Sequence, residues 1–162
     1  MTEKEKYALE WNNSAQYFYD HNSYKHLVAH ISKFKTVLEI GCGTGQSTLA
    51  LLEAGHSVIA IDQNAFCIEK AKQLIKASGY SVIENIGDLA PKTVCFIERD
   101  ITNPSFERDV LPNIFPDVVI CWNIGSYWDK AKVNDAVPKM IEYGLSREQI
   151  AENTESSYGE LI

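Results

Sequence analysis

Short runs of apolar residues alternate along the chain with segments whose apolar residues recur at helical spacing. Four runs predict strands, at residues 36–40, 57–61, 93–97 and 117–121. Because these runs are apolar at consecutive positions, we expect both faces of each strand to be covered. The last run is apolar on both faces over residues 118–121, so we expect an interior position in the sheet for it.

Two segments between these strands have the periodicity of amphipathic helices. Residues 46–54 and 64–78 each place apolar side chains on one stripe. Asn64 is placed to cap the second helix, and Gly55 and Gly79 stand where helices end. Strands that alternate with helices predict an α/β fold, with a doubly wound, mostly parallel sheet in the order 3-2-1-4.

The rest of the chain adds helical segments and one long loop. Residues 4–34 predict an N-terminal helical segment, interrupted at residues 12–13 and 21–23. Residues 101–115 contain prolines and predict a loop with one helical turn. A further helix is predicted over residues 130–143. No repeat or linker divides the chain, so we expect a single domain.

Composition narrows the function classes. The 162 residues carry a net charge of −7 without a basic run, which disfavours nucleic acid and anionic membranes as partners. No run approaches the ~18 apolar residues of a membrane span, and no signal-type segment is present, so we expect a cytoplasmic protein. The four cysteines and four histidines lack metal-ligand spacing. We therefore expect buried, reduced thiols and no metal site.

Three closely spaced glycines follow the first predicted strand, in the sequence Glu39-Ile-Gly41-Cys-Gly43-Thr-Gly45-Gln46. Glycines between a strand and a helix allow a tight turn and a close approach of a ligand to the backbone. A dinucleotide fingerprint would need glycine at position 46, where this chain has Gln46, and no P-loop is present. A nicotinamide oxidoreductase is therefore disfavoured.

Acidic residues close three successive strands of the predicted sheet. Glu39, Asp62 and Asp100 should meet at the carboxyl edge, where open α/β sheets bind ligands. Asp62 stands 17 residues after Gly45, where a carboxylate can accept both ribose hydroxyls of a nucleoside. This negative field disfavours a phosphate and favours a cationic nucleoside.

The glycine motif followed by a strand-ending acid resembles the class I S-adenosylmethionine-dependent methyltransferases, which have a Rossmann-like fold. The resemblance covers about residues 10–145. It implies S-adenosyl-L-methionine as cofactor and residues 1–34 as a helical lid on a core of residues 35–162. The implied cofactor-binding residues of the core's first three strands are Glu39, Gly41, Cys42, Gly43, Thr44, Gly45, Asp62, Gln63, Asp100 and Ile101.

The same resemblance assigns each of these groups a part of the cofactor. The glycine loop and Glu39 would serve its methionine part, Asp62 its ribose, and Gln63 its adenine. Asp100 would take the adenine amino group, and Ile101 would pack on the ring.

Residues outside these strands complete the implied site. Tyr17 on the lid and the pair Trp122-Asn123 after the fourth strand would also contact the cofactor. The aromatic residues Trp122, Tyr127 and Trp128 could hold a flat or cationic acceptor, or could equally pack under the next helix. No general base is evident.

Two departures from the family pattern shape the functional hypothesis. The sequence after the fourth strand, Cys121-Trp-Asn-Ile124, lacks the [DN]-P-P-[FY] motif of many nucleic-acid and protein amino-methylating enzymes. We therefore expect a small-molecule acceptor. The usual last three strands are not evident, so the core is predicted to be truncated, and a homodimer or a missing C-terminal segment would cover the open sheet edge. The alternative is a catalytically incomplete cofactor-binding module.

Overall fold

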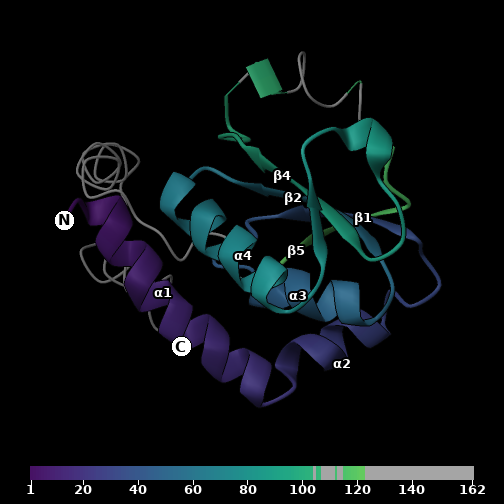
Figure 1. Ribbon diagram of the computed structural model, residues 1–162, viewed down its shortest axis with the longest axis horizontal. Coiled ribbons are helices and arrows are strands. Elements are labelled where there is room, and N and C mark those ends of the chain that lie inside the picture. Colours follow the sequence, from purple (N-terminus) through teal and green to yellow (C-terminus); the bar gives the residue numbers. More distant parts are fainter. Residues whose placement is uncertain (104, 107–111, 113–114, 123–162) are drawn as a thin grey trace, which may run out of the picture. The chain divides into compact units, whose positions relative to one another are not determined.

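A parallel sheet forms the centre of the fold in a computed structural model that describes residues 1–103, 105–106, 112 and 115–122. Its strands follow the order β3-β4-β2-β1-β5, and every pairing is parallel (Figure 1). The strands are β1 Thr36–Ile40, β2 Ser57–Asp62, β3 Ser81–Ile83, β4 Thr93–Glu98 and β5 Val118–Cys121. The helices are α1 Glu3–Asp20, α2 Ser23–Ala29, α3 Gln46–Glu53 and α4 Ala65–Ala77, with a 3-10 turn η1 at Ile86–Asp88.

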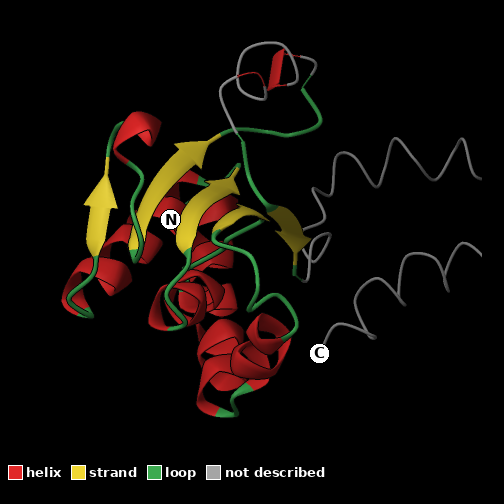
Figure 2. Ribbon diagram, turned by 90° about the vertical axis from the view of Figure 1, so that its right-hand side faces the viewer, coloured by secondary structure: helices red, strands yellow, loops and turns green. Residues whose placement is uncertain are grey.

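The four predicted strands are confirmed in the predicted order, as β4-β2-β1-β5. The sequence analysis missed β3, a strand of three residues whose central Val82 pairs with Val94 of β4. A run of three residues is too short to show a periodicity. It forms a strand because it pairs with β4 in the folded sheet. Figure 2 shows the strands side by side with the helices packed against them.

The N-terminal segment is one long helix followed by a short one. A capping box at Thr2 and Glu5 starts α1, which continues through residues 12–13, so the predicted interruption there is wrong. Asn12 accepts a hydrogen bond from the Gln46 side chain at 3.2 Å, which occupies a side chain that would otherwise compete with the helix backbone. The predicted break at residues 21–23 is confirmed by Asn22, whose φ of 60° is left-handed.

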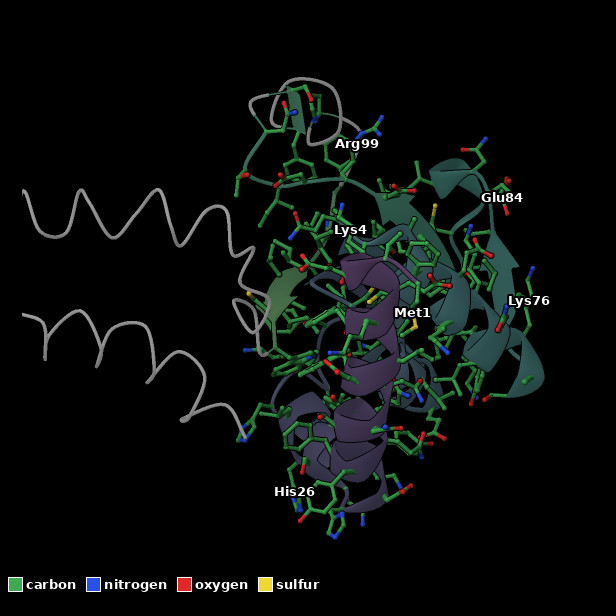
Figure 3. All side chains as sticks on the ribbon, turned by 90° about the vertical axis from the view of Figure 1, so that its left-hand side faces the viewer. Met1, Lys4, His26, Lys76, Glu84 and Arg99 are labelled. Carbon is green, nitrogen blue, oxygen red and sulfur yellow. The ribbon has the colours of Figure 1, made fainter. Side chains whose placement is uncertain are left out.

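The helix α1 packs against the other helices of the described part of the chain. Figure 3 shows it running from Lys4, on the side of Arg99 just after β4, toward α2, where His26 lies. It contacts α3 and α4 along this path. The N-terminal helix is therefore packed on the helices that cover the sheet. No helix among the described residues is long and apolar enough to cross a membrane.

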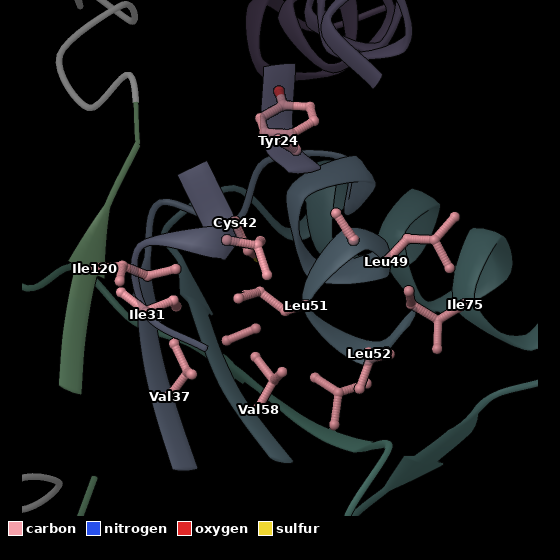
Figure 4. Close-up of a cluster of buried hydrophobic side chains, with 14 residues drawn as sticks. Tyr24, Ile31, Val37, Cys42, Leu49, Leu51, Leu52, Val58, Ile75 and Ile120 are labelled. Atoms are coloured by element: carbon pink, nitrogen blue, oxygen red, sulfur yellow. The ribbon is translucent and has the colours of Figure 1, made fainter. Parts of the chain in front are cut away.

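Buried side chains form a separate cluster on each face of the sheet, as expected for strands that are apolar at consecutive positions. On the helical face, Val37 of β1 and Val58 of β2 pack with Leu51 and Leu52 of α3 (Figure 4). The opposite face has a smaller cluster, made of Leu38, Ile59, Ile61 and Phe106. This two-sided burial fixes the carboxyl ends of β1 and β2.

The strand β5 pairs only with β1 among the described residues. Its Ile120 is buried, but Val119 is 54% exposed, so the predicted interior position is not met in this part of the chain. No described strand pairs with the outer edge of β5. Cys121 is likewise exposed, whereas the other three cysteines are buried as expected; all four are free thiols. The helix predicted over residues 130–143 lies outside the described residues.

Candidate cofactor site

The loop between β1 and α3 contains three glycines in left-handed conformations, with φ of 78°, 52° and 94° at Gly41, Gly43 and Gly45. Its backbone N–H groups bind oxygens of the protein itself. Gly41 and Cys42 donate to Ile61 O at 2.8 and 3.0 Å, Gly43 to Asp62 Oδ2 at 2.9 Å, and Gly45 to Cys42 O at 3.1 Å. The loop is therefore held close to the end of β2 and does not form a cradle of free N–H groups for a phosphate.

Asp62, at the end of β2, is brought against this loop as the sequence predicts for two parts of one site. Its Oδ2 accepts from Gly43 N, and its Oδ1 accepts from Asn64 N at 2.8 Å. Burial raises the pKa of Asp62, opposed by backbone N–H donors and by the positive charge of Lys4. The carboxylate is thus a fixed acceptor between the glycine loop and the start of α4.

Glu39 on β1 is fully buried and points at the start of α3. Ser47 Oγ donates to its Oε1, and Thr48 Oγ1 donates to its Oε2 at 2.5 Å. Burial raises the pKa of Glu39 to about 7, against the lowering effect of these two hydroxyls. Its geometry joins β1 to the first turn of α3, and its contact with a cofactor stays a prediction.

We expect Glu39 to make the protein less stable as pH rises. A folded-state pKa near 7, above the ordinary 4.5, means that its contribution is complete below about pH 4.5 and is lost as pH rises through about 7. The isosteric, neutral Glu39→Gln removes this titration. The difference in unfolding free energy, wild type minus variant, should fall by on the order of 2–3 kcal/mol between about pH 4.5 and pH 8. Urea unfolding at several pH values measures it, and a constant difference would contradict the burial argument.

The end of β4 brings the third predicted acid to the same edge of the sheet. Arg99 N donates to Asp62 O at 3.0 Å, which ties the segment after β4 to the end of β2. Asp100 Oδ1 accepts from both the N–H and the hydroxyl of Thr102, at 2.9 and 2.7 Å. Ile101 is 37% exposed and Gln63 is exposed. These side chains therefore lie at the carboxyl edge, where a ligand can reach them.

Sequence reasoning missed the part of α1 that covers the glycine loop. A Cβ atom added to Gly43 would overlap Trp11 Nε1, so the indole lies directly against this glycine. Beside it, the buried hydroxyl of Thr44 donates to Gln46 Oε1 at 2.7 Å, and Gln46 Nε2 donates to Asn12 Oδ1. A tryptophan within a charged N-terminal helix was the available signal, but periodicity alone did not show which face it occupies.

The other predicted aromatic residues have different surroundings. Tyr17 is 60% exposed, and its ring centroid lies 4.0 Å from that of His21, near the end of α1. Trp122 packs against the hydrophobic cluster on the helical face of the sheet. Its buried Nε1 has no hydrogen-bond partner within the described ranges. Asn123, Tyr127 and Trp128 lie outside the described residues. In the part that the structure describes, no group of His, Cys, Asp or Glu side chains could hold a metal ion.

Residues 37–143, which include the glycine loop and the ends of β2 and β4, match the family model described as a methyltransferase domain. The chain belongs to this family. It is also 35% identical, over 94 residues, to a protein of Methanosphaera stadtmanae named probable ribosomal RNA small subunit methyltransferase A. That match covers 57% of this chain and 35% of the relative, so the chain spans about a third of the relative's length.

Two solved structures are similar to this methyltransferase-family chain. One is described as a putative caffeoyl-CoA O-methyltransferase from Staphylococcus aureus, with 17% identity, a TM-score of 0.46, and coverage of 71% of this chain and 58% of the other. The second is described as an S-adenosylmethionine-dependent methyltransferase from Clostridium acetobutylicum, with 18% identity, a TM-score of 0.45, and coverage of 75% and 48%.

Proposed function

We propose that this chain binds S-adenosylmethionine and transfers its methyl group to a small-molecule acceptor. The observation that carries the proposal is the Asp62 carboxylate, fixed beside Gly43 at the carboxyl edge of the sheet. The site also fits the cofactor by its charge. The Asp62 and Asp100 carboxylates favour a cationic nucleoside, and a glycine loop whose N–H groups are already bonded suits a pyrophosphate poorly.

The chain's own residues would act by positioning. When bound, S-adenosylmethionine supplies an electrophilic methyl group, and its transfer needs the acceptor to be held in line and kept from water. Asp62 would hold the ribose hydroxyls, and the glycine loop would lie along the methionine part. Ile101 and Gln63, at the same edge, would face the adenine. The acceptor would bind beyond the end of β5, near Trp122.

Asp62→Ala is the first test. Loss of hydrogen bonds to a charged acceptor, each worth ~1.5–3 kcal/mol, should weaken binding of S-adenosylhomocysteine by roughly tenfold or more. Asp62→Asn keeps one side-chain oxygen that can accept from the N–H of Gly43 or Asn64. This variant therefore disturbs the fold less than Asp62→Ala and separates lost binding from misfolding. Asp88→Ala removes an exposed acid from η1 and should leave affinity unchanged. Calorimetry measures all three, and normal affinity in a folded Asp62→Ala protein would sink the proposal.

A nucleic-acid acceptor is the second candidate, because the Methanosphaera stadtmanae relative is named as a ribosomal RNA methyltransferase. The net charge of −7 and the sequence Cys121-Trp-Asn-Ile124 favour the small molecule instead. Incubation with radiolabelled S-adenosylmethionine separates the two candidates. Transfer of label to ribosomal RNA supports the second, and transfer to a low-molecular-weight fraction of a cell extract supports the first.

A further inference from the structure

The described glycine loop offers few donors to an anionic group. The N–H groups of Gly41, Cys42, Gly43 and Gly45 all bind oxygens of the protein. The carboxylates grouped at this edge also repel an anion. S-adenosylmethionine nevertheless ends in a carboxylate, which needs hydrogen-bond donors when it is removed from water. If the methionine part lies along this loop, another element has to add donors for its carboxylate.

The helix α1 brings donors to this position. Trp11 Nε1 is the indole atom nearest to the side-chain direction of Gly43. An indole N–H can only donate, so it suits an acceptor on a ligand. Asn12, the next residue, uses its oxygen to accept from Gln46, which leaves its two N–H groups outside this bond. The ammonium of Lys4 adds positive charge, which partly opposes the rise that burial causes in the pKa of Asp62.

Several contacts hold Trp11 in this place. Its ring stacks on Tyr7 one turn earlier, with centroids 6.4 Å apart and an interplanar angle of 3°. The Lys4 carbonyl accepts from Asn64 Nδ2 at 3.0 Å, which ties the first turn of α1 to the cap of α4. The bond between Asn12 and Gln46 ties the middle of α1 to the start of α3. The indole is therefore placed by contacts on both sides of it.

We propose that Trp11 donates its indole N–H to the carboxylate of the cofactor's amino-acid part, and that the Asn12–Gln46 bond positions it. This assignment rests on the proposed function and deepens it. It makes α1 a wall of the methionine subsite, with Trp11 as its polar contact. Trp11 is a binding residue, whereas Gln46 acts only through Asn12 and the helix.

The test compares two ligands that share the adenosine and the thioether. S-adenosylhomocysteine carries the amino-acid carboxylate, and 5′-methylthioadenosine lacks it. Trp11→Phe keeps the aromatic ring and removes the N–H, so calorimetry should show about a tenfold loss of affinity for S-adenosylhomocysteine. Affinity for 5′-methylthioadenosine should stay within about twofold of wild type. An equal loss for both ligands, or no loss for either, would overturn the assignment.

A second pair of variants keeps the test independent of any packing defect at Trp11. Asn12→Ala breaks the bond to Gln46 and should also weaken S-adenosylhomocysteine selectively. Asn13→Ala removes the same side chain from an exposed position one residue later and should change neither ligand. If Tyr17→Phe selectively weakens binding of S-adenosylhomocysteine and Trp11→Phe does not, the donor is Tyr17 and the proposal is refuted. If wild type binds neither ligand, the proposed function fails; if Asp62→Ala weakens both ligands but Trp11→Phe weakens neither, only this inference fails.

Discussion

Gly45→Ala is expected to lower the free energy of unfolding by about 3 kcal/mol or more. Gly45 precedes α3 with φ 94°, and a Cβ atom there would lie 2.8 Å from both Cα and Cβ of Ala71 on α4. Backbone atoms of a packed helix cannot rotate away as a flexible side chain can. The substitution therefore forces α3 and α4 apart, in addition to the strain of a left-handed alanine.

Gly55→Ala is the matched control for this expectation. Gly55 has a similar φ of 99°, but a Cβ atom there would have nothing within 4 Å. Only the conformational strain remains, which costs ~1–2 kcal/mol. Chemical denaturation of both variants separates strain from steric overlap. Equal destabilisation of the two would contradict the close packing of Gly45 on α4.

Gly43→Val is expected to reduce binding of S-adenosylhomocysteine beyond detection, by roughly a hundredfold or more, which is ~2.7 kcal/mol. The left-handed φ of 52° disfavours a β-branched residue, and the new side chain would displace Trp11 from the loop. Both effects disturb the surface along which the cofactor's methionine part is proposed to lie. Titration calorimetry is the measurement.

The far-ultraviolet circular dichroism of Gly43→Val should keep its mixture of helix and strand, because the loop is outside the strand pairing. Gly79→Val, with φ 82° and open space around its side-chain direction, tests a left-handed glycine far from the loop. It should lose stability but keep affinity. If Gly43→Val binds normally, the glycines serve only to turn the chain.

Most of the fold could be predicted because its main helices and strands are long enough to show a regular pattern of apolar residues in the sequence. The strands around Val37, Val58, Val94 and Val119 were found with their order. The strand β3 was missed because three residues have no measurable alternation. The continuity of α1 was missed because Asn12 is a weak helix former whose partner, Gln46, is 34 residues away. Local propensity cannot include a contact made by the folded chain.

The geometry of the candidate site could be predicted only where its residues belong to one local motif. The glycine loop and Asp62 were identified from their spacing, and the structure brings them within hydrogen-bond distance. Trp11 was not identified, because its place beside Gly43 depends on how α1 packs on α3 and α4. Glu39 shows a different limit. Its position was predicted, but its bonds to Ser47 and Thr48 come from the direction of α3, which no spacing rule gives.

The order of the strands in the sheet determines the sequence separation between strands that pair. Val37 of β1 pairs with Val58 of β2, 21 residues away, and with Val118 of β5, 81 residues away. Closing the longer loop costs more chain entropy before any contact compensates for it. We therefore expect the β1-α3-β2 unit to assemble early in folding and β5 to add late, when the Asp117 carboxylate can reach the N–H groups of Lys35 and Thr36. Until then one edge of β1 has no partner, and this nascent edge is where the folding chain is most open to pairing with another copy.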